Sequence, residues 1–264
     1  MPEGHTIHRQ ARDHTKLLVG AGPLAVSSPQ GRFAADAALV DGVELRRIEA
    51  YGKHMFHHWA NGLVGHIHLG LFGKYRVHLG DDEVTVIGEV RMRMVSPRAT
   101  VDLAGPTACT IGTVEDRDAI VARLGPDPLR RDARPEVAVA GMASRAPIGA
   151  VLLDQRVLCG VGNVYRAEAL FVNAINPQRP GRDCSDEERW ALWRTIVAML
   201  RQGVRDNRIV TIDRRELAVP RGPTRRGETT YVYYREHCLR CGTPVQTVTL
   251  AGRDCYFCPR CQPA

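Results

Sequence analysis

The fold is decided by two motifs near the end of the chain, Cys238-Leu239-Arg240-Cys241 and Cys258-Pro259-Arg260-Cys261. Sixteen residues separate them, and this C-x2-C-x16-C-x2-C spacing is typical of four thiolates around a zinc ion. The residues between the motifs would form a hairpin about Ala251-Gly252, which is too small to be stable without metal. The sequence therefore predicts one structural Zn2+, with Cys255 as a spare thiol close enough to compete for it, and with the ligands Cys238, Cys241, Cys258 and Cys261.

Upstream of these motifs the hydrophobic pattern is helical. Ser185 and Glu188 form a capping box at the start of one predicted helix. Before it, residues 159–166 read CGVGNVYR, and two glycines around one apolar residue permit tight turns close to a partner. Asn163 stands at the mouth of the next helix, where phosphates bind well. Residues 205–226 are rich in Arg, with Pro and Gly interspersed, and are predicted to form a mobile basic loop or linker.

In the N-terminal half, apolar and polar residues alternate as they do in short β-strands. A predicted helix over residues 5–18 comes first, and Asn61-Gly62 predicts a type I′ hairpin between two of the strands that follow. Short strands at this density indicate a sandwich or barrel. The predicted strands are residues 43–49, 54–59, 63–69, 74–79, 84–87, 90–95 and 99–103.

A stretch rich in Gly, Pro and Arg at residues 124–135 interrupts this pattern and predicts a domain boundary. We therefore predict an α+β multidomain protein in three parts. Residues 1–122 would be a β-sandwich with an N-terminal helix, residues 123–228 a helical domain, and residues 229–264 the zinc-finger hairpin.

Composition restricts the partner and the compartment. The net charge of +7 and the pI of about 9.2 favour an acidic partner such as nucleic acid, although a solvated basic surface gives the same balance. No secretory signal or apolar run long enough to cross a membrane is present, so the sequence predicts a soluble cytoplasmic protein. Eight Cys in such a protein argue for metal rather than disulfides.

The first residues carry a candidate nucleophile. Removal of Met1 would expose the secondary amine of Pro2, with the carboxyl of Glu3 one residue away. Amines that form Schiff bases are an established class of covalent catalyst. The alternative is that Met-Pro is only a common start to a chain. Lys53, one of three Lys in an Arg-rich sequence, is either a compact point charge or proton donor kept for function or an exposed lysine at a strand end.

Two further features of the strand region leave alternatives open. Leu71-Phe72 lies between Gly70 and Gly73, where such an apolar tip either packs onto its own domain or acts as a wedge between bases. Six histidines cluster in the same region, and because neither a carboxylate nor a Cys accompanies them, we predict that they are sheet-face side chains rather than metal ligands. They are His54, His57, His58, His66, His68 and His78.

Together these landmarks resemble the formamidopyrimidine-DNA glycosylase and endonuclease VIII family of base-excision repair enzymes. They occur in the family's order over essentially the whole chain. The matching residues are Pro2-Glu3-Gly4, Gly52-Lys53, Leu124-Gly125-Pro126-Asp127, Gln155, Gly160-Val161-Gly162-Asn163-Val164-Tyr165, Arg253 and the four-cysteine finger.

The resemblance implies a chemistry for four residues. Pro2 would attack C1′ of a damaged nucleoside and displace the base, and Glu3 would act as general acid on the sugar ring oxygen. Lys53 would hold phosphate and assist β-elimination. Arg253 would bind phosphate and assist δ-elimination.

The resemblance also implies a two-domain clamp with DNA in the cleft, built from the sandwich and from a helix-two-turn-helix domain with the zinc finger. Arg123 and Asn163 would grip the DNA backbone. Leu71 and Phe72 would fill the gap left by a flipped base.

Departures from the family pattern bear on the substrate. The purine-directed branch usually has Met in the first wedge loop and an Arg-Arg-Phe-Gly-like second loop, whereas this chain has Leu71 and no such motif in residues 90–97. Residues 227–231 are also short for a purine-capping loop. Endonuclease VIII is the better match, although His5-Thr6 stands where the family commonly has Pro-Glu.

The prediction is a DNA repair enzyme, a glycosylase and abasic-site lyase that excises oxidised pyrimidines through a Schiff base at Pro2 and cleaves by β,δ-elimination. The alternatives are a non-catalytic damaged-DNA-binding protein and an enzyme for oxidised purines such as 8-oxoguanine or formamidopyrimidine. The expected partner is damaged DNA, duplex or single-stranded. We expect a monomer in the bacterial cytoplasm, associated with the nucleoid through DNA.

Overall fold

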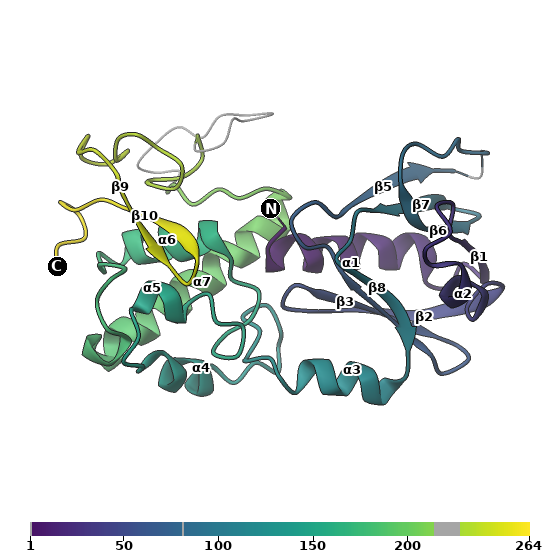
Figure 1. Cartoon of the computed structure of the whole chain (residues 1–264), viewed down its shortest axis with the longest axis horizontal. Coiled ribbons are helices and arrows are strands. Elements are labelled where there is room, and N and C mark those ends of the chain that lie inside the picture. The colour runs from purple at the N-terminus through teal and green to yellow at the C-terminus, as the bar shows by residue number, and fades with distance from the viewer. Residues whose placement is uncertain (1, 81, 214–227) are drawn as a thin grey trace. The chain divides into compact units, whose positions relative to one another are not determined.

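A computed structural model of the protein describes residues 2–80, 82–213 and 228–264. The chain divides into two compact units, Met1–Arg123 and Leu124–Ala264 (Figure 1). Among the described residues, no helix has the length and apolar character needed to cross a membrane. Most of the predicted basic linker, residues 214–226, lies outside the described residues.

In the described part of the first unit, eight antiparallel strands are hydrogen-bonded in the order β5-β7-β6-β1-β2-β3-β4-β8. β1 pairs with β2 through Pro23 and Leu24 and with β6 through Ala25, Val26 and Ser27, so it joins two four-stranded halves. The strands are β1 (Pro23–Ser27), β2 (Val43–Tyr51), β3 (His54–Trp59), β4 (Val64–His68), β5 (Lys74–Leu79), β6 (Val90–Ser96), β7 (Ala99–Ala104) and β8 (Ala108–Gly112).

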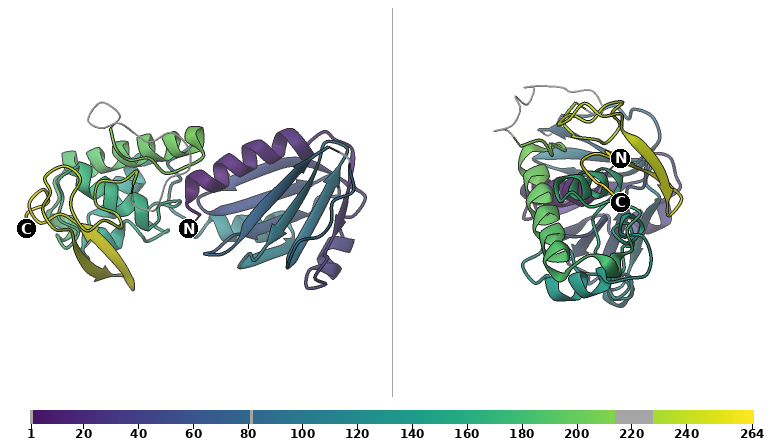
Figure 2. Two further views of the ribbon diagram at one scale, coloured as in Figure 1. Left: turned by 90° about the horizontal axis from the view of Figure 1, so that it is seen from above. Right: turned by 90° about the vertical axis from the view of Figure 1, so that its left-hand side faces the viewer.

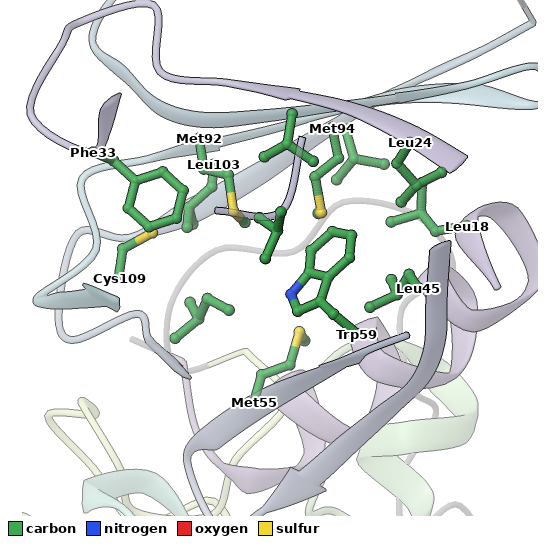
Figure 3. Close-up of a cluster of buried hydrophobic side chains, with 14 of the residues drawn as sticks. Leu18, Leu24, Phe33, Leu45, Met55, Trp59, Met92, Met94, Leu103 and Cys109 are labelled. Carbon is green, nitrogen blue, oxygen red and sulfur yellow. The ribbon is translucent and has the colours of Figure 1, made fainter. Parts of the chain in front are cut away.

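The two halves face each other across one apolar core. Met92 and Met94 of β6 pack in the same cluster as Met55 and Trp59 of β3 (Figure 3). Helix α1 (Gly4–Leu18) packs along β2 and β3 (Figure 2) and buries Ile7, Ala11 and Leu18 at its apolar spacing. The predicted sandwich with an N-terminal helix is confirmed. Two short helices, α2 (Ala34–Ala38) and α3 (Val114–Val121), complete the unit.

Three local predictions were wrong. Residues 84–87 are not a strand, and among the described residues they pair with no strand of the sheet, although β5 stands at its edge. β1 and β8 were not predicted. The hairpin at Asn61-Gly62 exists, but only Gly62 has a positive φ (85°), whereas a type I′ turn requires positive φ at both central residues.

The second unit is helical and ends in a hairpin. The capping box of Ser185 and Glu188 is present at the start of α7 (Asp186–Asp206). Ala251 and Gly252 both have positive φ and form the tight turn between β9 (Gln246–Leu250) and β10 (Arg253–Phe257). The other elements are α4 (Pro135–Met142), α5 (Ile148–Val151), α6 (Asn163–Val172) and the 3-10 turn η1 (Gly181–Asp183).

Candidate functional site

The first turn of α1 fixes the candidate nucleophile and acid. Pro2 is half-buried and directly precedes Glu3, which is the N-cap residue of α1 and is fully buried. The Glu3 carbonyl oxygen accepts the backbone N–H of Thr6 at 2.9 Å. Both residues therefore lie at the positive end of the helix dipole, which favours a carboxylate and disfavours a protonated amine. Their catalytic roles stay predictions.

Lys53 borders a cluster of neutral histidines. It is half-buried and follows the turn at Gly52, where φ is 57°. His54 Nδ1 lies 2.9 Å from His66 Nε2, and the His54 and His68 ring centroids are 4.8 Å apart. Burial, together with the smaller effects of the charges of His68, His66, Lys53 and Arg123, lowers the pKa of His54 to about 3. The side chains of Lys53 and Arg123 therefore act on the same face of the sheet.

The same face has a pocket of about 340 Å³ between β4, β8 and α3. His66, Arg117 and Arg123 are among its lining residues. Arg117 also pairs with the buried Glu49 carboxylate and stacks over the Phe56 ring at 5.6 Å. Arg123 is the exposed cation of this group. The predicted sheet-face position of His54, His66 and His68 agrees with this arrangement.

The apolar tip between β4 and β5 does not pack onto its own unit. Leu71 is 52% exposed and Phe72 is 84% exposed. Gly70 supports the turn with a φ of 65°, and the Gly73 N–H donates to the Leu69 carbonyl oxygen at 2.9 Å. Residues 90–97, where we looked for a second wedge loop, are mostly strand β6, and the loop beside the tip is residues 105–107.

In the second unit, Asn163 is tied to the hairpin. It is the first residue of α6, and its Nδ2 donates to the Asp254 carbonyl oxygen at 2.8 Å. Gln155 braces the glycine turn before it, accepting from the Gly160 N–H at 3.1 Å and donating to the Val161 carbonyl oxygen at 3.1 Å. The N-terminus of α6 is therefore held firmly against β10.

Arg166 is a structural residue that the sequence did not reveal. It is fully buried, and its guanidinium donates to Asn163 Oδ1 and to the carbonyl oxygens of Leu250, Arg253 and Asp254. Arg253 itself is exposed at the first position of β10. Arg166 thus connects two residues that the family resemblance assigns to phosphate.

Glu168 is a second fully buried charge on α6. Its carboxylate accepts the backbone N–H groups of Tyr231, Val232 and Tyr233 at 2.7–2.9 Å and the hydroxyl of Thr211. Burial raises the pKa of Glu168, and these hydrogen bonds oppose that shift. Glu168 therefore attaches two segments of the chain to α6: Thr211, which precedes residues 214–227, and Tyr231 to Tyr233, which follow them.

The four predicted zinc ligands come together. Their Sγ atoms all lie within 4.8 Å of one another, with Cys241 at 3.5 Å from both Cys258 and Cys261. A tetrahedral ion with Zn–S bonds of 2.3 Å separates sulfurs by about 3.8 Å, so the four thiols fit zinc. Cys255 instead points into the apolar core of the second unit, and is not a competing ligand.

Comparisons with known proteins agree with this geometry. Residues 1–104 match the model of the formamidopyrimidine-DNA glycosylase N-terminal domain, residues 124–214 match its H2TH domain, and residues 235–264 match the zinc finger found in FPG and IleRS. Among solved structures, an FPG mutant from Lactococcus lactis in complex with a Fapy-dG containing DNA superimposes with a TM-score of 0.83 over 100% of both chains, at 20% identity. Because the identity is only 20%, this similarity shows the fold alone.

Two curated relatives share more of the sequence. "Endonuclease 8 1" of Mycobacterium tuberculosis is 46% identical over 99% of this chain and 100% of its own length. "DNA-(apurinic or apyrimidinic site) lyase Nei2" of Mycolicibacterium smegmatis is 34% identical over 100% of both. The family domains in their order and this full-length identity show that the chain belongs to the family of formamidopyrimidine-DNA glycosylases and endonucleases VIII.

Proposed function

We propose that this protein is a bifunctional DNA glycosylase and abasic-site lyase that excises oxidised pyrimidines from DNA. Its family and the names of its relatives support the enzyme class. The observation that carries the proposal is the position of Pro2 directly before the buried Glu3 at the start of α1.

The first step is base removal. With Met1 removed, the lone pair of the Pro2 amine attacks C1′, and the damaged base leaves with the glycosidic electron pair and takes up the proton that the amine releases. Glu3 then protonates the ring oxygen as the C1′–O4′ bond breaks and the nitrogen lone pair forms the C=N bond. The product is an iminium ion between Pro2 and the opened sugar. An α-amine titrates near pH 8, and the helix dipole and partial burial both disfavour its charged form, so more neutral amine is available at pH 7.

Strand cleavage follows from the same intermediate. The iminium acidifies the C2′ proton, whose loss expels the 3′ phosphate by β-elimination, and a second elimination expels the 5′ phosphate. Lys53 would hold phosphate and assist the first elimination, and Arg253 the second. Arg123 would contribute a further phosphate contact. Asn163, whose amide already donates to Asp254, would act by holding the Arg253 hairpin and by presenting the N-terminus of α6.

The proposed preference for oxidised pyrimidines rests on the apolar tip of Leu71 and Phe72 and on the absence of the sequence features typical of the purine-directed branch. Leu71 stands where the purine-directed branch usually has Met, and residues 227–231 are short for a purine cap. The exposed Leu71 and Phe72 suit a wedge that fills the space of a flipped base in duplex DNA.

We propose a monomer with one structural zinc and with the zinc-finger hairpin as a separate part of the second unit.

Borohydride trapping tests the proposal. The protein is mixed with a duplex containing 5-hydroxyuracil, an abasic site or 8-oxoguanine, reductant is added, and the adduct is mapped by mass spectrometry. We expect a Pro2 adduct with the first two duplexes, and loss of 5-hydroxyuracil removal in Glu3→Gln with DNA binding intact. An adduct at another residue would refute the mechanism, and faster trapping on 8-oxoguanine would refute the pyrimidine preference.

A further inference from the structure

The exposed tip rests on the loop between β7 and β8. The backbone N–H of Thr107 donates to the His68 carbonyl oxygen at 2.9 Å, and the Thr107 hydroxyl reaches the same oxygen at 3.0 Å. His68 ends β4 and Gly70 begins the turn that carries Leu71 and Phe72. Thr107 therefore holds the strand end from which the tip projects.

The methyl group of Thr107 fills the space that a side chain at position 70 would need. A Cβ on Gly70 would lie 2.3 Å from Thr107 Cγ2, closer than any ordinary contact. On the other side of the tip, a Cβ on Gly105 would lie 3.5 Å from the Phe72 carbonyl oxygen. Thr107 and Gly105 thus contact the tip at its first and last turn.

The His68 ring completes this contact. Its Nδ1 accepts the Gly70 N–H at 3.2 Å and lies 2.9 Å from Thr107 Oγ1. Because Nδ1 accepts the Gly70 N–H, a neutral His68 carries its proton on Nε2, and the single hydroxyl proton of Thr107 is donated to either the Nδ1 or the carbonyl oxygen of His68. Burial and the neighbouring Lys53 charge lower the pKa of His68, which favours this neutral form. The side chains of His68 and Thr107, which lie outside the tip, therefore fix the tip backbone at Gly70.

We propose that Thr107 is a positioning residue that holds Leu71 and Phe72 as a rigid wedge and thereby sets the rate at which a damaged base leaves the duplex stack. This inference rests on the proposed function. A tip ordered before DNA binds loses less conformational entropy when it enters the stack, so opening of the base pair is faster. An abasic site has no base to unstack, and its cleavage depends much less on the wedge.

Two single variants separate the hydroxyl from the methyl group. Thr107 is solvent-exposed, so neither variant disturbs the core. Thr107→Val keeps the shape but removes the hydrogen bond, and base removal from a 5-hydroxyuracil duplex should slow about tenfold, as for one lost hydrogen bond. Thr107→Ser keeps the hydrogen bond and should stay within about threefold of the unchanged protein. Strand cleavage at a preformed abasic site should change less than about twofold in both.

A second pair of variants tests the contact itself. Gly70→Ala should slow base removal through the collision with Thr107, and adding Thr107→Ser should restore part of the rate because it removes the colliding methyl group and keeps the hydroxyl. Fluorescence of 2-aminopurine next to the lesion reports insertion of the wedge directly, and its rise should slow in parallel with base removal.

The outcomes separate this inference from the proposed function. If the unchanged protein neither removes 5-hydroxyuracil nor cleaves an abasic site, the proposed function fails. If it does both, and Thr107→Val matches it on both duplexes, the positioning role of Thr107 is refuted. Equal loss on both duplexes in Thr107→Val would also refute it, because a merely structural role would give that result.

Discussion

Arg166 is a buried cation that connects α6 to the zinc-finger hairpin. Its buried guanidinium donates to three carbonyl oxygens of the hairpin and to Asn163 Oδ1. We expect Arg166→Met to lower the free energy of unfolding of this unit by about 3 kcal/mol, because it leaves buried acceptors without donors. Urea unfolding followed by tryptophan fluorescence gives the value.

The matched control is Arg156→Met. The Arg156 side chain is 80% exposed and pairs with Asp154 at the surface, so its loss should change stability by less than about 0.5 kcal/mol. DNA binding should weaken in the Arg166 variant and change little in the Arg156 variant. Equal stability of the two variants would show that Arg166 does not hold the hairpin.

Single residues were predictable from sequence where local rules apply. The zinc ligands followed from cysteine spacing, and the capping box of Ser185 and Glu188 followed from a four-residue pattern. Arg166 and Glu168 were not predictable, because charged residues are normally exposed and most of their partners, the hairpin carbonyls of Arg166 and the donors to Glu168, lie more than forty positions away in the chain. The tertiary structure alone supplies those partners.

The zinc-finger hairpin is an element whose stability depends on its metal. Its two strands have five residues each, too few to be stable alone in water. We expect Cys241→Ala to lose zinc and to disorder β9 and β10, while helix α7 remains. Cys255→Ala should keep a full complement of zinc, because that thiol points into the core. The zinc content of the two variants, measured by atomic emission, distinguishes the roles of Cys241 and Cys255. Loss of zinc in both variants would show that Cys255 is a ligand.

Helix α1 is joined to the sheet by buried histidines, which makes the first unit sensitive to acid. Burial lowers the pKa of His5 and His14 to about 4 and that of His57 to about 3. Their ordinary value is 6.5, so between pH 6.5 and 4 the unfolded chain binds protons that the folded unit does not. The free energy of unfolding should therefore fall with decreasing pH by about 1.4 kcal/mol per pH unit for each histidine.

His57→Leu provides the control for this prediction. Neither ring nitrogen of His57 has a hydrogen-bond partner within the described residues, so a leucine fits the site without leaving a donor unpaired. The pH dependence of the variant should be shallower by one histidine's contribution. An unchanged slope in urea titrations from pH 7 to pH 4.5 would mean that His57 takes up its proton in the folded unit.

Elements were predictable where one periodicity held for a whole segment. The helix at residues 5–18 and the hairpin about Ala251-Gly252 were confirmed by α1 and by β9 and β10. The strand predicted at residues 84–87 was wrong even though its residues favour strands, and among the described residues it pairs with neither edge of the sheet, β5 or β8. Strand pairing is decided by the whole sheet, which local sequence does not specify.

At the scale of the whole molecule, the two units have separate cores. The first encloses Trp59, and the second encloses Trp193 with Trp190 packed against it. We expect two unfolding transitions in urea, with the first unit's midpoint falling selectively at pH 5. In Trp59→Phe, tryptophan fluorescence reports on the second unit only. In the double variant Trp190→Phe and Trp193→Phe, it reports on the first unit only. A single shared transition in both proteins would show that the units unfold together.

The attachment of Glu168 has a consequence for how this chain can change in evolution. The Thr211 N–H donates to the Thr229 carbonyl oxygen, and the Asp213 N–H donates to the Tyr231 hydroxyl, so the ends of the connection between residues 213 and 228 are already closed. Inserted residues there add only loop-closure entropy, about 0.6 kcal/mol for each doubling of length. The length of this connection can therefore change through insertions and deletions while the helix that carries Asn163 keeps its fold.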